Sequence, residues 1–268
     1  MKKEYEKLYD TKETEEEALR RLIEIVGVLR QECPWDKVQT HQTLTACMTE
    51  EAYEVVDAIQ KNDYENLKEE LGDVLLQVVF HGILGEEKEL FDIKGVINDE
   101  CEKMIRRHPH IFLEENVKTI DKALEKWENM KSKEQCSTTY TDRLKKVPLA
   151  LPALTRSYKI QKRAAVVGFD WDDVNEAFSK VNEESEELID AYRKGDRAGM
   201  TEELGDLLFS VVNVSRFLDI NPEEALNSTS VKFIKRFAYI EDKAIERGVS
   251  IQDMTLDEMD KLWNEAKK

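Results

Sequence analysis

The sequence predicts an all-α fold of two tandem helical bundles with little or no sheet. The first observation is an internal repeat: residues 49–79 match residues 182–212 without a gap, and almost half of the aligned positions are identical. The second is periodicity, because apolar residues recur at helical spacing and no stretch alternates cleanly at period two. We therefore expect two domains, residues 1–131 and 148–268, joined by a linker over residues 132–147.

Composition narrows the class of protein. The 268-residue chain carries a formal net charge of −17, and a nucleic-acid surface would need a basic face, so we expect no nucleic-acid partner. The polar N-terminal segment predicts no secretory signal, and no apolar run approaches the roughly 20 residues of a membrane-spanning helix. Four cysteines without CxxC spacing are typical of reduced thiols in the cytosol. We therefore expect a soluble cytoplasmic protein that contacts no membrane.

The first half begins with a helix over residues 18–29, where apolar side chains recur every three or four positions. Pro34 ends this helix, and a loop over residues 33–41 leads into the repeated acidic segment. A later helix, residues 93–107, carries basic residues toward its C-terminal end, where the helix dipole favours cations.

The second half repeats this order. Residues 132–146 are polar and lack helical periodicity, which predicts the linker. An opening helix over residues 154–167 leads to the second acidic segment. A helix from 222 through 225 and a long helix over 231–247 are expected to follow it.

The repeated segment carries carboxylates three residues apart, so each pair shares one helix face. Lys194, Gly195 and Asp196 interrupt the helical pattern between the two pairs, which predicts a helical hairpin with opposed acidic faces. The pairs in the second copy are Glu184 with Glu187 and Glu203 with Asp206, and the first copy has Glu51, Glu54, Glu70 and Asp73.

Apolar residues surround most of the second helix of each hairpin, so we expect this helix to be buried with its polar stripe pointing into the bundle. Carboxylates that converge there would repel one another, and a hard divalent cation such as Mg²⁺ relieves that repulsion. A single acidic segment would be interpreted as solvated surface, but the repetition favours a metal site. His41, beside such a site, is interpreted as a packing or hydrogen-bonding residue, because Mg²⁺ prefers oxygen ligands.

The spacing EExxE followed by ExxD resembles the motif of MazG-type nucleoside triphosphate pyrophosphohydrolases, in the all-α NTP pyrophosphatase superfamily. The resemblance extends to the flanking segments 33–41, 106–110 and 159–171, and it covers nearly the whole chain, including the tandem arrangement. It implies hydrolysis of a nucleoside triphosphate between the α and β phosphates, giving the monophosphate and pyrophosphate. It also implies two MazG-like domains, a nucleotide housekeeping role and a homodimer.

The resemblance assigns roles to individual residues, with Mg²⁺ as cofactor and Mn²⁺ as its substitute. The expected catalytic and metal-binding residues are Glu184, Glu187, Glu203 and Asp206, and the expected metal ligands of the first copy are Glu51, Glu54, Glu70 and Asp73. The expected substrate-binding residues are Lys180, Lys232, Arg236 and Trp263, with Lys103, Arg107 and Trp127 in the first half. Trp263 has an alternative interpretation as a core anchor for the C-terminal helix.

Two alternatives to this function stay open. One is a non-enzymatic helical regulator that senses nucleotide and metal, and the other is a narrower pyrophosphatase, such as one acting on dUTP. The absence of a GxxxxGK[ST] segment argues against γ-phosphate cleavage of the P-loop type. The copies also differ: Lys180 lies one helical turn before Glu184, where the first copy has Cys47. A thiol cannot supply a cation to phosphate, so we expect the second half to carry most of the activity.

Overall fold

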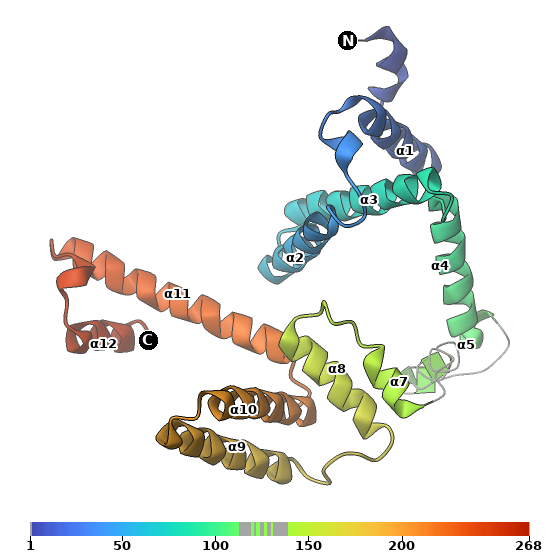
Figure 1. The fold of residues 1–268 in the computed structure, drawn as a ribbon. Helices are drawn as coiled ribbons and strands as arrows, with labels where there is room; N and C mark the ends of the chain where they lie inside the picture. The colour runs from blue at the N-terminus through green and yellow to red at the C-terminus, as the bar shows by residue number, and fades with distance from the viewer. Residues whose placement is uncertain are drawn as a thin grey trace. The chain divides into compact units, whose positions relative to one another are not determined.

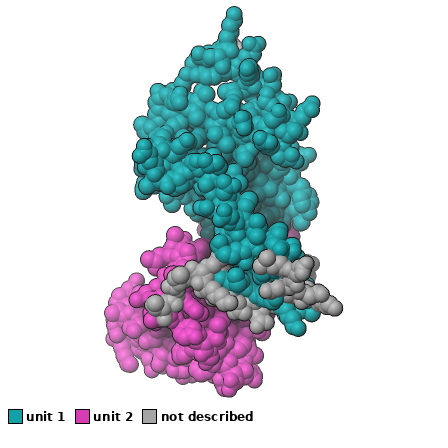
Figure 2. Space-filling view, turned by 90° about the vertical axis from the view of Figure 1, so that its right-hand side faces the viewer, with its two compact units in different colours: residues 1–134 teal, residues 135–268 magenta. Residues whose placement is uncertain are grey.

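The computed structural model of the chain describes residues 2–112, 119–120, 122–123, 126–127, 130 and 139–267. All regular secondary structure in these residues is helical, so the all-α prediction is confirmed (Figure 1). The chain divides into two compact units, Met1–Glu134 and Gln135–Lys268 (Figure 2). The domain limits at 131 and 148 stay a prediction. None of the described helices has the length and apolar character needed to cross a membrane.

The first unit packs its long helices around a small apolar core. The core consists of Val26, Leu44, Val79, Phe80 and Leu84, all nearly inaccessible to solvent. The elements are η1 (Lys3–Leu8), α1 (Glu15–Glu32), η2 (Asp36–Val38), α2 (Thr45–Lys61), α3 (Tyr64–Glu87), α4 (Ile93–Arg107) and α5 (Pro109–Phe112). Helices α1 and α2 both pack on α3, so α3 is the central helix of this unit.

The second unit repeats the paired-helix arrangement and adds a long helix. Its elements are α7 (Tyr140–Lys145), α8 (Ala153–Ala165), α9 (Val174–Lys194), α10 (Arg197–Phe217), α11 (Pro222–Glu246), η3 (Ile251–Asp253) and α12 (Leu256–Glu265). Helices α9 and α10 run side by side, and α12 packs on the far part of α11 (Figure 1).

Helix α11 is continuous, so the prediction of separate helices over 222–225 and 231–247 is wrong. The polar residues between them bind backbone carbonyls one turn earlier: Thr229 Oγ1 donates to the Ala225 carbonyl at 3.0 Å and Ser230 Oγ to the Leu226 carbonyl at 3.1 Å. Hydroxyls that bond in this way can remain inside a helix.

Part of the predicted linker is also helical. Residues 132–138 lie outside the described part of the chain, but α7 follows directly, although its sequence has no helical apolar periodicity. Thr139 accepts a hydrogen bond from the Asp142 backbone N–H, and Asp142 accepts one from the Thr139 backbone N–H. This reciprocal capping box stabilises a short helix that periodicity alone does not predict.

The same turn closes both acidic hairpins, as the repeat predicts. Asn62 and Gly195 end α2 and α9 with positive φ angles of 56° and 69°. The next residue, Asp63 or Asp196, caps the following helix by accepting a hydrogen bond from a backbone N–H three residues on. A left-handed residue followed by a capping aspartate reverses the chain within two residues, which sets the paired helices antiparallel.

The predicted burial of α3 and α10 is correct on one face only. Gln77 and Ser210, from the polar stripes, are each 7% exposed, so that part of the stripe does point inward. On the other side of α10, however, Leu204 and Leu208 are each 49% exposed. Leu71, on α3, is 52% exposed in the same way. Each hairpin therefore has an apolar face that its own unit does not cover.

Candidate active site

Three carboxylates of the second unit converge between α9 and α10. One oxygen from each of Glu184, Glu187 and Glu203 lies within 4.8 Å of the others. The Glu184 side chain is buried, whereas Glu187 is exposed at the rim. Asp206, three residues after Glu203 on α10, is exposed and lies outside this closest group. The hairpin therefore brings together three of the four residues predicted here, with the fourth on the adjoining turn.

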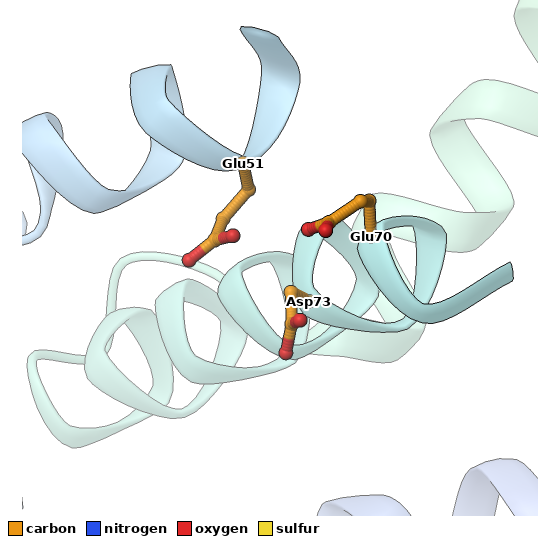
Figure 3. A group of neighbouring side chains, drawn as sticks. All are labelled: Glu51, Glu70 and Asp73. Carbon is orange, nitrogen blue, oxygen red and sulfur yellow. The ribbon is translucent and has the colours of Figure 1, made fainter. Parts of the chain in front are cut away.

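The first unit contains an equivalent cluster of three carboxylates, but a different one of the four predicted residues lies outside it. Glu51 extends from α2 toward α3, and Glu70 reaches from α3 toward it, beside Asp73 (Figure 3). One oxygen from each of these residues lies within 4.8 Å of the others, and all three are half-buried. Glu54 is exposed and outside the closest group, although its carboxyl contributes to the pKa of both Glu51 and Glu70.

Crowding and burial make these carboxyl groups harder to ionise. The pKa of Glu203 is raised, first by desolvation and then by the negative charges of Glu187 and Glu184. In the first unit, desolvation and the Asp73 charge raise the pKa of Glu51. The pKa of Glu70 is raised by desolvation and by the charge of Glu54. Closely spaced carboxylate oxygens that repel one another fit a hard divalent cation such as Mg²⁺ or Mn²⁺.

Lys180 lies directly against the second cluster. Its Nζ is 2.6 Å from a Glu184 oxygen and 2.9 Å from a Glu183 oxygen, and these contacts raise the lysine pKa. In the first unit the equivalent residue, Cys47, packs against the apolar core and has a thiol where Lys180 has an ammonium group. Among the described residues, the replacement of Lys180 by Cys47 therefore leaves the ion pair in the second cluster only, and the unequal activity of the two halves stays a prediction.

An arginine stacks on a tryptophan in each unit. The Arg236 guanidinium lies 5.4 Å from the centre of the Trp263 ring, and Arg107 lies 5.7 Å from that of Trp127. Phe233 also contacts Trp263, with ring centroids 5.0 Å apart. The adjoining Leu262 is 1% exposed and anchors α12 to α11. Trp263 itself is half-buried, so it keeps an accessible edge while its helix is held by its neighbour.

The packing within the second unit does not join all the predicted residues into one site. Helix α12 packs on α11, α11 packs on α8, and α10 packs on both α8 and α9. Neither α11 nor α12 packs extensively on the acidic hairpin, so Arg236 and Trp263 are not held against Glu184 by these contacts. Lys232 is exposed on α11. In the first unit, Lys103 forms an ion pair with Glu100 one turn earlier on α4.

Two arginines that the sequence interpretation missed hold the loops before the hairpins. Arg216, on α10, makes a two-pronged ion pair with Asp170, and one of these hydrogen bonds is 2.9 Å long. In the first unit, Arg30 Nε donates to Glu87 at 2.8 Å, and Arg30 also donates to the Asp36 and Gln39 carbonyls. The charged partners are 46 and 57 residues apart in sequence, so no helical spacing could predict them.

His41 is a packing residue, as predicted. Its ring stacks on that of His81 with centroids 5.0 Å apart and an interplanar angle of 2°, and the two Nδ1 atoms are 2.8 Å apart. His41 is not part of either carboxylate cluster. With the repeat offset of 133 residues, the second unit has Val174 and Val214 in these places, so the histidine pair belongs to the first unit only.

A cavity of about 320 Å³ lies between α8 and the start of α11. Its lining includes Thr155, Lys159 and Asn221, but no residue predicted to bind metal or substrate. The cavity is therefore separate from the carboxylate cluster.

Comparison with known proteins shows that one protein family matches both segments that contain the acidic hairpins. Residues 39–112 and 174–240 match the MazG nucleotide pyrophosphohydrolase domain. The chain is 39% identical over 253 residues to a nucleoside triphosphate pyrophosphohydrolase of Escherichia coli (strain K12), covering 92% of this chain and 96% of that protein. It is also 39% identical over 248 residues to the nucleoside triphosphate pyrophosphohydrolase/pyrophosphatase MazG of Thermotoga maritima, covering 92% of this chain and 94% of that one.

A longer relative shares the same two segments. The uncharacterized protein YabN of Bacillus subtilis (strain 168) is 46% identical over 237 residues, which is 88% of this chain. The chain spans 48% of the length of that protein. The similarity to the three relatives thus runs through both units.

Proposed function

The chain belongs to the MazG nucleotide pyrophosphohydrolase family, and from this premise we propose that it hydrolyses nucleoside triphosphates between the α and β phosphates. It is an enzyme of the nucleotide pyrophosphohydrolase type, and the products would be the nucleoside monophosphate and pyrophosphate. The observation that carries the proposal is the convergence of Glu184, Glu187 and Glu203, whose oxygens lie within 4.8 Å of one another.

The proposed cofactor is Mg²⁺, for which Mn²⁺ can substitute. The residues that would hold it are Glu184, Glu187, Glu203 and Asp206, with Glu51, Glu54, Glu70 and Asp73 as the ligands in the first unit. The support is the donor chemistry, because clustered carboxylate oxygens are what a hard divalent cation prefers. When bound, such a cation polarises phosphate oxygens and lowers the pKa of a coordinated water.

The chain's own groups would do the remaining work. Glu187 and Asp206 are exposed at the rim, and a carboxylate oxygen of either residue that does not bind the cation would accept a hydrogen bond from the attacking water and take its proton. Lys180, Lys232 and Arg236 would bind the triphosphate and stabilise the charge that develops on it. The corresponding cations in the first unit are Lys103 and Arg107.

The base would stack on the accessible part of Trp263, beside Phe233. This role requires α11 and α12 to approach the acidic hairpin, on which they do not pack extensively in this structure. Trp127, with Arg107 against its ring, is the equivalent surface in the first unit. Because the first unit has Cys47 in place of Lys180, we assign most of the activity to the second unit. The proposed location of the enzyme is the cytoplasm, where nucleoside triphosphates are abundant.

We further propose that the protein acts as a homodimer. The uncovered apolar face of α10, where Leu204 and Leu208 are half-exposed, would be buried by pairing with a second copy. Exposed Val231 and Ile234 on α11 support the same conclusion. Multi-angle light scattering at micromolar concentration should give twice the chain mass of 31.2 kDa, whereas a mass of one chain would contradict the dimer.

The test of the function is a product analysis over a panel of common and modified triphosphates with Mg²⁺. Anion-exchange chromatography should detect the monophosphate and pyrophosphate in equal amounts. Release of diphosphate and orthophosphate would place the cleavage elsewhere. Turnover of dUTP alone would favour the narrower pyrophosphatase, and nucleotide binding without turnover would favour a regulator.

A further inference from the structure

Lys180 occupies an unusual place for a residue expected to contact phosphate. Its Nζ lies 2.6 Å from Glu184, and the Glu184 side chain is only 6% exposed. A buried carboxylate without a partner costs considerable free energy, so this ammonium group compensates the most buried charge of the cluster. The second contact, 2.9 Å to Glu183, holds the lysine between two carboxylates.

The same Glu184 contributes an oxygen to the cluster with Glu187 and Glu203. A divalent cation bound there would share a carboxylate with the ammonium group at close range. Two cations so close to each other repel strongly, so the ammonium and the metal compete for Glu184.

The first unit lacks this arrangement. Cys47 stands in place of the lysine and packs against the apolar core. Neither the three clustered residues of the first unit, Glu51, Glu70 and Asp73, nor the neighbouring Glu54 forms an ion pair with any residue that the structure describes. A resident ammonium group is therefore a property of the second cluster and not of the acidic hairpin in general.

We propose that Lys180 is the counter-ion of the metal-free second site, and that it leaves Glu184 when a divalent cation and a triphosphate bind. This rests on the proposed function, since the ammonium group is then released toward the phosphates. Lys180 is a positioning residue in the metal-free protein: its ion pair holds the Glu184 side chain in place. It weakens metal binding until a polyanion offers the ammonium group another partner. Metal and nucleotide binding are thereby coupled in the second unit.

The experiment measures Mn²⁺ binding by titration calorimetry without nucleotide. It uses the full chain carrying Glu70→Gln and Asp73→Asn, so that the first cluster does not obscure the signal. Lys180→Met in this background should tighten Mn²⁺ binding by about two- to tenfold, a modest effect because the lysine is partly exposed. Lys180→Arg, which keeps the charge, should bind Mn²⁺ as weakly as the parent. Lys194→Met, on the same helix but at its far end, is the matched control and should change nothing.

A second readout tests the counter-ion role itself. In EDTA, Lys180→Met should melt at a lower temperature than the parent and gain more from added Mn²⁺, because Glu184 then lacks its partner. Unchanged or weaker Mn²⁺ binding by Lys180→Met would overturn the proposal. The outcome is independent of turnover: if the parent releases no pyrophosphate but Lys180→Met tightens Mn²⁺ binding, the proposed function fails and the counter-ion role stands.

Discussion

Replacing Glu51 by glutamine should stabilise the metal-free first unit. Oxygens of Glu51, Glu70 and Asp73 lie within 4.8 Å of one another, so Glu51 has two charged neighbours. At that separation two unit charges repel by about 0.9 kcal/mol at a dielectric constant of 80 and about 3.5 kcal/mol at 20. The Glu51 carboxyl is still in contact with water, which screens the repulsion, so the lower figure applies to each neighbour, and Glu51→Gln should gain about 1–2 kcal/mol.

The assay is differential scanning calorimetry at pH 7, in EDTA and in excess Mn²⁺. The gain corresponds to a rise in the melting temperature of the first unit by roughly 3–8 °C in EDTA. In Mn²⁺ the order should reverse, because the variant lacks a metal ligand that the parent has. Glu50→Gln, an exposed neighbour outside the cluster, is the matched control and should follow the parent in both conditions.

The gain should also depend on pH with a definite sign. Burial and the neighbouring charges raise the pKa of Glu51 above its unfolded value of 4.5, so the folded protein binds the proton more tightly. The parent therefore loses stability as pH rises from about 4.5 through the folded pKa, and the advantage of Glu51→Gln should be absent at lower pH. A lower melting temperature for Glu51→Gln in EDTA at pH 7, or an unchanged response to Mn²⁺, would show that charge repulsion does not destabilise the first cluster.

Two further predictions concern the parts of the fold that surround the sites. Leu262→Ala removes the buried anchor of α12, which should lower the free energy of unfolding by about 2–5 kcal/mol and speed hydrogen exchange in α12. It should also raise KM more than it lowers kcat, because Trp263 is then no longer held in place. Normal protection of α12 in this variant would contradict the anchoring role. Burial and the His41 charge lower the pKa of His81, so urea unfolding should show that the free energy of unfolding falls as pH drops below about 6.5. His81→Val should flatten this pH dependence. The same slope of stability against pH in the variant and in the parent would exclude the histidine pair as its cause.

The repeat made the helical hairpins predictable because each of their features is local. The acidic residues three apart share a face by helix geometry alone, and Asp63 and Asp196 cap the helices that follow them. Lys180 lies four residues before Glu184, and this helical spacing predicted that the two side chains are neighbours. The spacing could not tell whether the lysine contacts a carboxylate or a phosphate, which depends on what else is bound.

Features that depend on distant parts of the chain could not be predicted in this way. Apolar periodicity identified the faces of α3 and α10, but it cannot tell that Leu204 is left uncovered by its own unit. Arg216 finds Asp170 across 46 residues, and α7 is stabilised by one capping box and not by an apolar stripe. The separation of Trp263 from the acidic hairpin is likewise a property of helix packing that residue spacing does not contain.

The most direct test of the account compares matched double variants of the two clusters. Glu203→Gln with Asp206→Asn and Glu70→Gln with Asp73→Asn are assayed for pyrophosphate release from the same triphosphates in Mg²⁺, after circular dichroism has established that both are folded. The variant of the second cluster should lose activity by about 100-fold or more, and the variant of the first should keep most of it. A folded second-cluster variant that turns over at the parental rate would contradict the proposed active site.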